Sequence, residues 1–120
     1  MLNLDDVITA RQRIAPYIRH TPLMPKPFLT DEFPAQLQLK LENLQVSGSF
    51  KARGAFNNIL KATQEERDRG IIVASGGNHG LAIAYAAAKL GVRATVYLPK
   101  SASADRVERI AAWGTEIVQY

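Results

Sequence analysis

The sequence contains no cysteine. This absence excludes a disulfide framework, thiolate metal sites and a cysteine nucleophile. No apolar run approaches the ~18 residues that a membrane-spanning helix needs. The N-terminus carries acidic residues where a signal peptide has basic ones, and it lacks the apolar stretch of such a peptide. These absences predict a soluble cytoplasmic protein with no membrane partner.

Histidine is scarce, and His20 and His79 lie far apart in the sequence. Without cysteines or paired histidines, we expect no protein metal site. The formal net charge is +4, but the basic residues are scattered among acidic ones and do not form a stripe with aromatic residues. We therefore expect no nucleic-acid partner and favour a small anionic ligand.

The remaining composition is that of a soluble globular protein, with 47% hydrophobic and 22% charged residues in 120. This composition argues against a disordered chain, a collagen-like fibre and a coiled coil. A chain of this length buries roughly 65% of its unfolded surface on folding, which is enough for one modest core.

The first residues predict a helix. Asn3 is suited to cap it, and Pro16 is expected to mark its end. Leu4, Val7 and Ile8 recur at helical spacing and are expected to form its apolar face.

The segment from 21 to 34 is rich in proline and is expected to be extended and irregular. Residues 37–42 alternate between apolar and polar, as in a half-buried strand, so Glu42 is expected to be a surface carboxylate rather than a general acid. A second helix is predicted after Ser49, its expected N-cap. Its apolar positions are Ala52, Ala55, Phe56, Ile59 and Leu60.

After Gly70 the chain alternates between strands and helices. The predicted elements are a strand at 71–74, a helix at 81–90 ended by Gly91, a strand at 94–98, a helix at 103–113 with Val107, Ile110 and Ala111 inward, and a strand at 116–118. This order predicts an α/β fold with a parallel sheet of strand–helix units, each strand apolar enough to be interior. Residues 75–80 and 100–103 then lie at the carboxyl ends of strands, where such sheets bind ligands.

The segment Ser47-Gly48-Ser49-Phe50-Lys51-Ala52-Arg53-Gly54-Ala55 breaks a local rule. Lys51 and Arg53 would lie in the first helical turn, where each cation opposes the helix dipole by about 0.3–1 kcal/mol. Such violations tend to mark functional sites, and a neutral lysine amine at this position suits Schiff-base chemistry. The alternative is a pair of solvated surface cations. The spacing is not that of a phosphate-binding Walker loop.

The segment Ser75-Gly76-Gly77-Asn78-His79-Gly80 lies between a buried strand and a buried helix. Its glycines allow close approach of a ligand, and the following helix offers free N–H groups to an anion. The dinucleotide fingerprint is not met, so a carboxylate or phosphate is favoured over a dinucleotide. The alternative is a plain tight turn in which Asn78 caps the helix.

Taken together, the two motifs resemble a known family. The runs Lys40-Leu41-Glu42-Asn43-Leu44, Gly48 to Ala55 and Ser75 to Gly80 are similar to fold-type II (tryptophan synthase β-like) pyridoxal-phosphate enzymes, most of all the serine/threonine dehydratase–serine racemase branch. The resemblance covers the whole chain but only the N-terminal third or so of such an enzyme.

The resemblance implies a cofactor, pyridoxal 5'-phosphate, and roles for residues of both motifs. Lys51 would be the catalytic lysine that forms the Schiff base, Phe50 would pack against the pyridine ring, and Asn78 would hydrogen-bond the phenolic oxygen of the cofactor. The substrate carboxylate would be received by Ser75, Gly76, Gly77, Asn78 and His79.

The implied function is that of an ammonia-lyase of amino-acid metabolism. It would dehydrate serine/threonine-type β-hydroxy amino acids to a 2-oxo acid and ammonia, with the amine of Lys51 removing the α-proton. Serine racemases place a second serine where this sequence has Gly76, so dehydration is favoured over racemisation. Serine racemase and a β-replacing synthase are the alternatives within the family, and a non-catalytic fragment or interaction module is the alternative outside it.

The resemblance also implies a domain division. Residues 1–69 would pack with a larger domain that is mostly absent from this sequence, and residues 70–120 would form most of a smaller α/β domain. The family's glycine-rich phosphate cradle and its partner for the pyridine nitrogen match nothing here. The complete protein is expected to form a homodimer.

Overall fold

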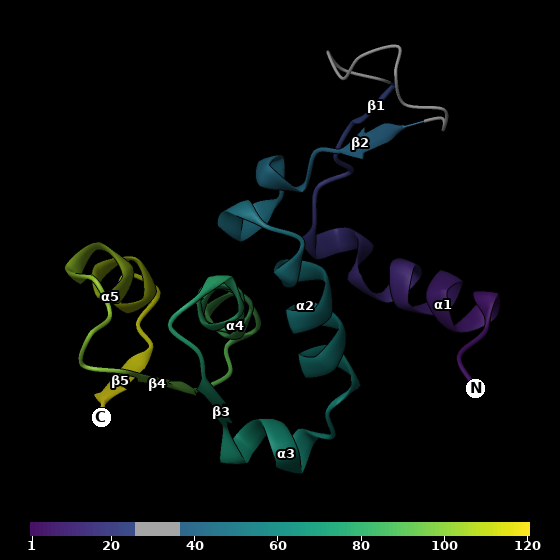
Figure 1. The fold of residues 1–120 in the computed structure, drawn as a ribbon. Helices are drawn as coiled ribbons and strands as arrows, with labels where there is room; N and C mark the ends of the chain where they lie inside the picture. Colours follow the sequence, from purple (N-terminus) through teal and green to yellow (C-terminus); the bar gives the residue numbers. More distant parts are fainter. Residues whose placement is uncertain (26–36) are drawn as a thin grey trace.

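The computed structural model describes residues 1–25 and 37–120 (Figure 1). The N-terminal part contains α1 (Leu4–Ile14), η1 (Ala15–Tyr17), β1 (Leu23–Pro25), β2 (Gln38–Lys40), η2 (Glu42–Leu44), η3 (Val46–Gly48) and α2 (Lys51–Lys61). The C-terminal part contains α3 (Gln64–Arg69), β3 (Ile71–Ala74), α4 (Asn78–Leu90), β4 (Ala94–Leu98), α5 (Ala104–Ala111) and β5 (Glu116–Gln119).

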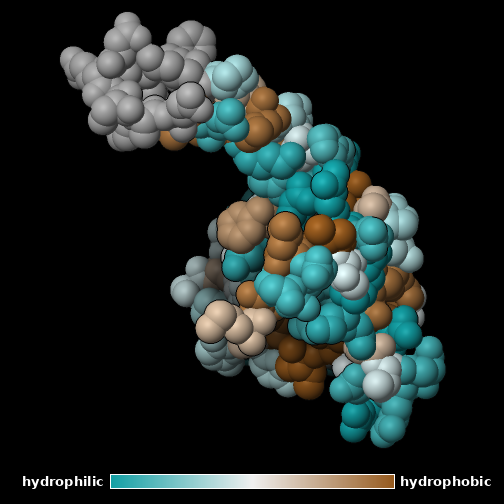
Figure 2. All heavy atoms as spheres, turned by 90° about the vertical axis from the view of Figure 1, so that its right-hand side faces the viewer, coloured by the Kyte–Doolittle hydropathy of each residue, from teal (hydrophilic) through white to brown (hydrophobic). Residues whose placement is uncertain are grey.

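Helix α1 begins as predicted but does not bury the predicted face. Asn3 and Asp6 form a reciprocal capping box, in which each side chain accepts the other's backbone N–H at 3.0 Å. Leu4, Val7 and Ile8, the predicted apolar face, are 72%, 61% and 44% exposed, so no described residue covers this face. The buried residue of α1 is Ile14, which joins the core shared with α2. The face that carries α1 accordingly shows apolar side chains among polar ones (Figure 2).

Strands β1 and β2 form a short antiparallel pair that projects from the helices (Figure 1). Both strands are exposed along their length. The half-buried strand predicted at 37–42 is therefore present as β2, but neither of its faces is buried. β2 ends at Lys40, and Glu42 begins a 3-10 turn instead of continuing the strand. β1 occupies part of the proline-rich segment, and residues 26–34 of that segment lie outside the described residues.

The predicted parallel sheet is confirmed, with strand order β3-β4-β5. Helices α4 and α5 contact each other and lie on the same side of this sheet (Figure 1). Ile72 on the other side is 73% exposed, which corrects the expectation of wholly interior strands. The carboxyl ends of the parallel strands lie at the same edge of the sheet, and there residues 75–80 follow β3 and residues 100–103 follow β4.

Helices α3, α4 and α5 differ from the prediction. α3 was not predicted, because it has no apolar face and is recognisable only by its capping box of Thr63 and Glu66. α4 begins at Asn78, earlier than expected. α5 is shorter than expected at both ends, and Ala111 is exposed although Ile110 is buried as predicted.

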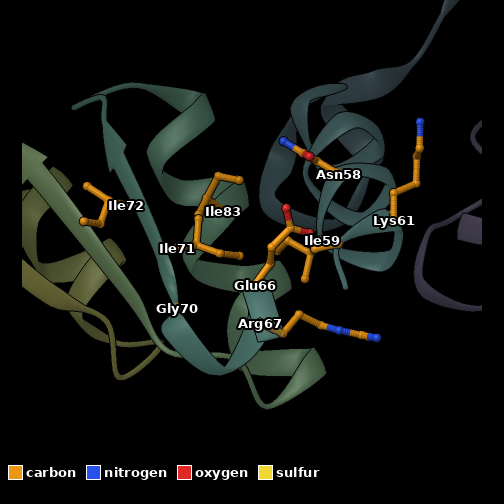
Figure 3. Close-up of a pocket in the computed structure, with 10 residues that line it drawn as sticks. Asn58, Ile59, Lys61, Glu66, Arg67, Gly70, Ile71, Ile72 and Ile83 are labelled. Carbon is orange, nitrogen blue, oxygen red and sulfur yellow. The ribbon is translucent and has the colours of Figure 1, made fainter. Parts of the chain in front are cut away.

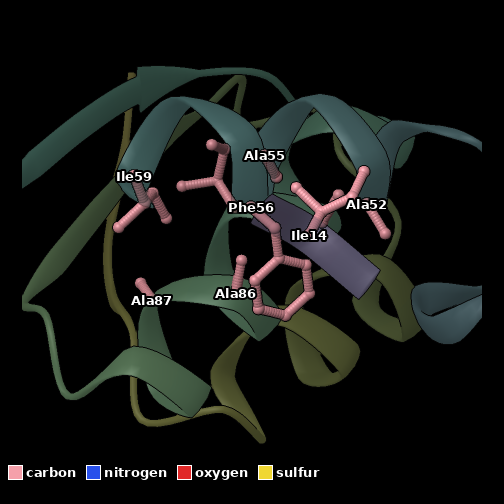
Figure 4. Packing of buried hydrophobic residues seen from close by; sticks show 9 residues of the cluster. Ile14, Ala52, Ala55, Phe56, Ile59, Ala86 and Ala87 are labelled. Carbon is pink, nitrogen blue, oxygen red and sulfur yellow. The ribbon is translucent and has the colours of Figure 1, made fainter. Parts of the chain in front are cut away.

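The core that positions the two motifs lies between α2 and α4. Figure 4 shows the ring of Phe56 directed from α2 towards Ala86 on α4. Phe56 is 0% exposed; its ring stacks on Tyr17 at a centroid distance of 5.1 Å and meets Tyr85 edge-on at 5.9 Å. The alanines of α4 let the two helices approach closely. The helix that begins at Lys51 and the helix that begins at Asn78 therefore share one core.

Candidate active site

The turn before Lys51 is tightly bent. Ser47 has a positive φ of 60°, which is uncommon for a residue other than glycine, and its buried hydroxyl has no hydrogen-bond partner in the described part of the chain. Ser49 is extended and 6% exposed, and its hydroxyl accepts the backbone N–H of Lys51 at 3.4 Å. The helix begins at Lys51 with Phe50 at the N-cap position, so the predicted N-cap at Ser49 is displaced by one residue although Ser49 supplies the capping oxygen.

Lys51 and Phe50 both face solvent. Phe50 is 59% exposed, and the ammonium nitrogen of Lys51 lies 5.1 Å from the centroid of its ring. Within residues 1–25 and 37–120, no hydrogen bond or ion pair involves this ammonium group. The amine is thus accessible to a ligand.

Arg53, by contrast, is not a solvated cation. Its Nε donates to Oε2 of Glu42 at 2.8 Å and its Nη2 donates to Oε1 at 2.7 Å. The Glu42 side chain is only 15% exposed, so the prediction of a surface carboxylate is wrong. The alternative of two solvated cations is therefore wrong for Arg53. The bidentate ion pair with Glu42 offsets the unfavourable interaction between the Arg53 charge and the dipole of α2.

The surroundings of Glu42 favour its charged form. Hydrogen bonding from Arg53 lowers the pKa of the Glu42 carboxyl to about 2, although desolvation by burial opposes this. The hydroxyl of Thr21, which donates to the same carboxylate, and the positive charges of Arg53 and Lys40 make smaller contributions to this lowering of the pKa. The carboxylate is therefore ionised throughout the physiological pH range.

This ion pair gives a pH-dependent prediction. Because the pKa of Glu42 is lower in the folded than in the unfolded protein, its contribution to stability is complete above about pH 4.3 and is lost as the pH falls towards about 2. At pH 6, Glu42→Gln should lower the free energy of unfolding by about 2 kcal/mol, because Arg53 loses its partner. Urea unfolding between pH 6 and pH 2 should show this difference shrinking below about pH 4.3.

Glu65→Gln is the matched control for that measurement. The Glu65 side chain is 82% exposed and pairs with Arg69 only at 3.9 Å. This variant should change stability little at any pH. A difference for Glu42→Gln that stayed constant down to pH 2 would contradict the assignment.

The second motif, Ser75–Gly80, which we call the glycine loop, comprises the turn that follows β3 and the first helical residues of α4. Ser75 donates its backbone N–H to Tyr97 on β4 at 3.2 Å, and its hydroxyl accepts the N–H of Gly77 at 3.3 Å. Gly80 is buried, and any side chain there would collide with the Ser75 carbonyl oxygen, so the loop lies directly against the first turn of α4.

The start of α4 is left open to a ligand. Its N-cap is Gly77, which has no side chain to bond the first amides, so the alternative in which Asn78 caps the helix is wrong. Asn78 is exposed, and its Oδ1 accepts from Arg106 of α5 at 3.4 Å. His79 is also exposed. Free backbone N–H groups at this helix start suit a carboxylate or phosphate.

The fold brings the two motifs to neighbouring positions. η3, the turn that precedes Lys51, contacts α4, and α4 begins in the glycine loop. A pocket of about 410 Å³ lies elsewhere, lined by the end of α2, α3 and the start of β3 (Figure 3). None of the predicted site residues lines that pocket.

Several buried polar residues near Lys51 were not predicted as parts of the site. Thr21 and Gln45 are each 2% exposed and bond to other segments of the chain. Their partners are distant in sequence, so no local pattern indicates them.

The described residues show neither a metal-binding cluster nor a helix suited to span a membrane. No cluster of three histidine, cysteine, aspartate or glutamate side chains in this part of the chain could hold a metal ion. Among the same residues, no helix combines the length and apolar character needed to cross a membrane.

Comparison with known proteins identifies the family. Residues 14–120 match the family described as "Pyridoxal-phosphate dependent enzyme". The chain belongs to this family. The pyridoxal-phosphate cofactor and the resemblance drawn from the two motifs are thereby confirmed.

Two curated relatives are similar to this chain over nearly its whole length. The chain is 42% identical to an L-threo-3-hydroxyaspartate ammonia-lyase of Saccharomyces cerevisiae, over 96% of this chain and 35% of the relative. It is 39% identical to a catabolic L-threonine dehydratase of Staphylococcus aureus, over 98% of this chain and 34% of the relative. The chain thus spans about a third of the length of these curated relatives.

A solved structure supports the fold. The serine racemase of Dictyostelium discoideum superimposes with a TM-score of 0.91 and 35% sequence identity, over 98% of this chain and 38% of the racemase. The predicted α/β fold class, as part of a fold-type II pyridoxal-phosphate enzyme, is therefore confirmed.

Proposed function

We propose that the complete protein containing this chain is a pyridoxal-phosphate-dependent ammonia-lyase. It dehydrates serine/threonine-type β-hydroxy amino acids to a 2-oxo acid and ammonia. The observation that carries the proposal is the accessible amine of Lys51 at the start of α2, beside a helix start that is open to an anion. The names of the relatives, an L-threonine dehydratase and an L-threo-3-hydroxyaspartate ammonia-lyase, support the choice of substrate class.

The residues present fit the cofactor. A Schiff-base lysine must reach its ligand, and the Lys51 ammonium has no competing partner in the described part of the chain. Phe50 offers an exposed aromatic face next to it, suited to a planar ring. Asn78 is exposed at the start of α4, where its amide can hydrogen-bond a ligand oxygen.

Each residue then has a role in the reaction. When bound, pyridoxal phosphate supplies an electron sink for the bond broken at the α-carbon of the amino acid. The Nζ of Lys51 would hold the cofactor and, as a free amine, would accept the α-proton of the substrate. The substrate's β-hydroxyl leaves as water, and a water is consumed when ammonia is released, so substrate yields oxo acid and ammonia.

The glycine loop orients the substrate. Ser75, Gly76, Gly77, Asn78 and His79 bind its carboxylate, using backbone N–H groups at the start of α4. Gly76 and Gly77 carry no side chain, so the backbone here can approach a ligand closely. The carboxylate is thereby held while Lys51 acts on the α-carbon.

The assembly of the complete protein is part of the proposal. Residues 1–69 pack with a larger domain, residues 70–120 form most of the smaller one, and the protein is a cytoplasmic homodimer. The shared core of α2 and α4 would fix the first segment against the second. Analytical ultracentrifugation of the complete protein measures the oligomeric state.

The test of the activity is direct. The complete protein, loaded with cofactor, is incubated with L-serine, L-threonine or a 3-hydroxyaspartate, and the 2-oxo acid and ammonia are measured. Formation of both in equal amounts is expected with at least one substrate. If no 2-oxo acid forms although the cofactor is demonstrably bound, the lyase proposal is wrong. A β-replacing synthase or a non-catalytic interaction module would then be favoured.

Racemisation is the second candidate, favoured by the similarity to serine racemase. Position 76 gives a test, because a Cβ there would lie 3.6 Å from Leu98 and 3.7 Å from Pro99, which is ordinary contact. Gly76→Ser should therefore fold normally, within about 1 kcal/mol of the wild type. It adds a hydroxyl that can exchange a proton, so we expect D-serine formation from L-serine to rise.

Gly54→Ser is the matched control, because a side chain at Gly54 meets nothing within 4 Å and lies outside the glycine loop. Chiral chromatography of the products compares the variants. Equal D-serine formation by the wild type and by Gly76→Ser would mean that the missing hydroxyl does not limit racemisation.

A further inference from the structure

Arg53 lies in the same first turn as Lys51, and its guanidinium is held in one orientation. The two bonds to Glu42, at 2.8 and 2.7 Å, run from adjacent nitrogens to both carboxylate oxygens. Such a planar fork is specific in geometry as well as strong. The first turn of α2 is therefore fixed to the residue that begins η2.

Glu42 also binds a third segment. The hydroxyl of Thr21 donates to its Oε1 at 2.5 Å, and the Lys40 ammonium donates to the Thr21 carbonyl oxygen at 2.5 Å. Thr21 is 2% exposed. One carboxylate thus joins the segment before β1, the start of η2 and the first turn of α2 in a partly buried network.

The loop between Glu42 and Lys51 is fixed a second time at Gln45. Its Oε1 accepts the backbone N–H groups of Arg19 at 2.7 Å and of Val46 at 3.0 Å, and its Nε2 donates to the Arg19 carbonyl at 2.8 Å. Gln45 is 2% exposed, so these bonds are shielded from water. The segment that leads into Lys51 is therefore fixed by hydrogen bonds at Glu42 and again at Gln45.

The Lys51 side chain has no such support of its own. Among the described residues its ammonium makes a cation–π contact with the ring of Phe50 and no hydrogen bond or ion pair, so the backbone of the turn sets the point from which the side chain reaches. We propose that the Glu42–Arg53 ion pair is a positioning device for Lys51, which holds the first turn of α2 so that the amine meets the cofactor and the substrate α-carbon. This inference rests on the proposed function, because it assigns no separate reaction.

The proposal distinguishes positioning from binding. Glu42 and Arg53 bond to each other, so neither is needed to contact the substrate, and the KM for the amino acid should change little when the pair is broken. Displacing a reacting group by about 1 Å can cost roughly a hundredfold in rate. We therefore expect kcat to fall, together with the rate at which the apoprotein couples cofactor to Lys51.

The experiment uses the complete protein and the isosteric variant Glu42→Gln. Apoprotein is mixed with pyridoxal phosphate, samples are reduced with borohydride over time, and mass spectrometry measures the fraction labelled at Lys51. Glu42→Gln should label at least about tenfold more slowly than wild type, at a temperature where circular dichroism shows both fully folded. Glu65→Gln, the same change at an 82% exposed side chain, should label at the wild-type rate.

Arg53→Lys is the second variant, which keeps the cation but loses the fork, and it decides the matter if Glu42→Gln does not fold. Its labelling rate should lie between those of Glu42→Gln and the wild type, or, where only Arg53→Lys folds, below the wild type. Lower melting temperatures with wild-type labelling and kcat in the variants that fold would overturn the proposal, because the pair would then serve stability alone. Absence of labelling at Lys51 in the wild type would instead overturn the proposed function, and this inference with it.

Discussion

Lys51→Ala in the complete protein is expected to lower turnover of a β-hydroxy amino acid by roughly a thousandfold or more, because the variant loses both the amine that binds the cofactor and the acceptor of the α-proton. Borohydride reduction should leave no cofactor attached to the segment that contains position 51. The melting temperature should hardly change, since Lys51 is exposed and its ammonium makes no hydrogen bond within the described residues.

Lys61→Ala is the matched control, because Lys61 is an exposed lysine at the other end of the same helix. Its activity and labelling should equal those of the wild type. Retained turnover in Lys51→Ala, or labelling that moves to another lysine without loss of rate, would contradict the assignment of Lys51.

Phe56→Ala is expected to be among the most destabilising single changes, at about 3–5 kcal/mol. Phe56 is 0% exposed, and its ring contacts Tyr17 and Tyr85 in the core between α2 and α4. Stabilities of whole domains are typically about 5–15 kcal/mol, so this loss is a large fraction of the total. Urea unfolding followed by circular dichroism measures it.

Phe50→Ala is the control for that change, because Phe50 is the same residue type at 59% exposure. Its cost in stability should stay below about 1 kcal/mol, while cofactor binding should weaken. Equal destabilisation by the two variants would show that the α2–α4 core does not depend on the Phe56 ring.

Elements with a strong local signal could be predicted from the sequence. The apolar spacing of α2 and the alternation of strands and helices after Gly70 are local patterns, and the structure confirms both. The apolar faces of these elements pack against one another within the chain, as the ring of Phe56 on α2 packs against Ala86 on α4.

Burial could not be predicted for several apolar side chains. Val7 on α1 and Leu39 on β2 carry the expected periodicity, yet both are exposed. Periodicity indicates which face of an element is apolar, but it does not show what covers that face. The same limit explains Ile72, which lies in a correctly predicted strand and faces solvent.

The sequence predicts the residues of the candidate site, but it does not predict the contacts that hold these residues in place. Lys51 and the glycine loop were found because they break local rules of helix and turn composition. The Glu42–Arg53 pair was missed because a pairing across a turn leaves no periodic trace, and Glu42 continued the alternation of a strand that ends at Lys40. Gly77 rather than Asn78 caps α4, a choice that depends on backbone angles which residue type alone does not fix.

The aromatic rings of the core have an optical consequence. The Tyr85 ring lies 4.7 Å from the ring of Trp113, the single tryptophan of this chain, and the two meet edge-on. At such a separation, light absorbed by the tyrosine is passed to the indole and emitted there. Tyr85 also contacts Phe56, whose ring is stacked on Tyr17. The fluorescence of Trp113 is therefore a built-in reporter of how α4 sits against the end of α5, and it needs no added dye.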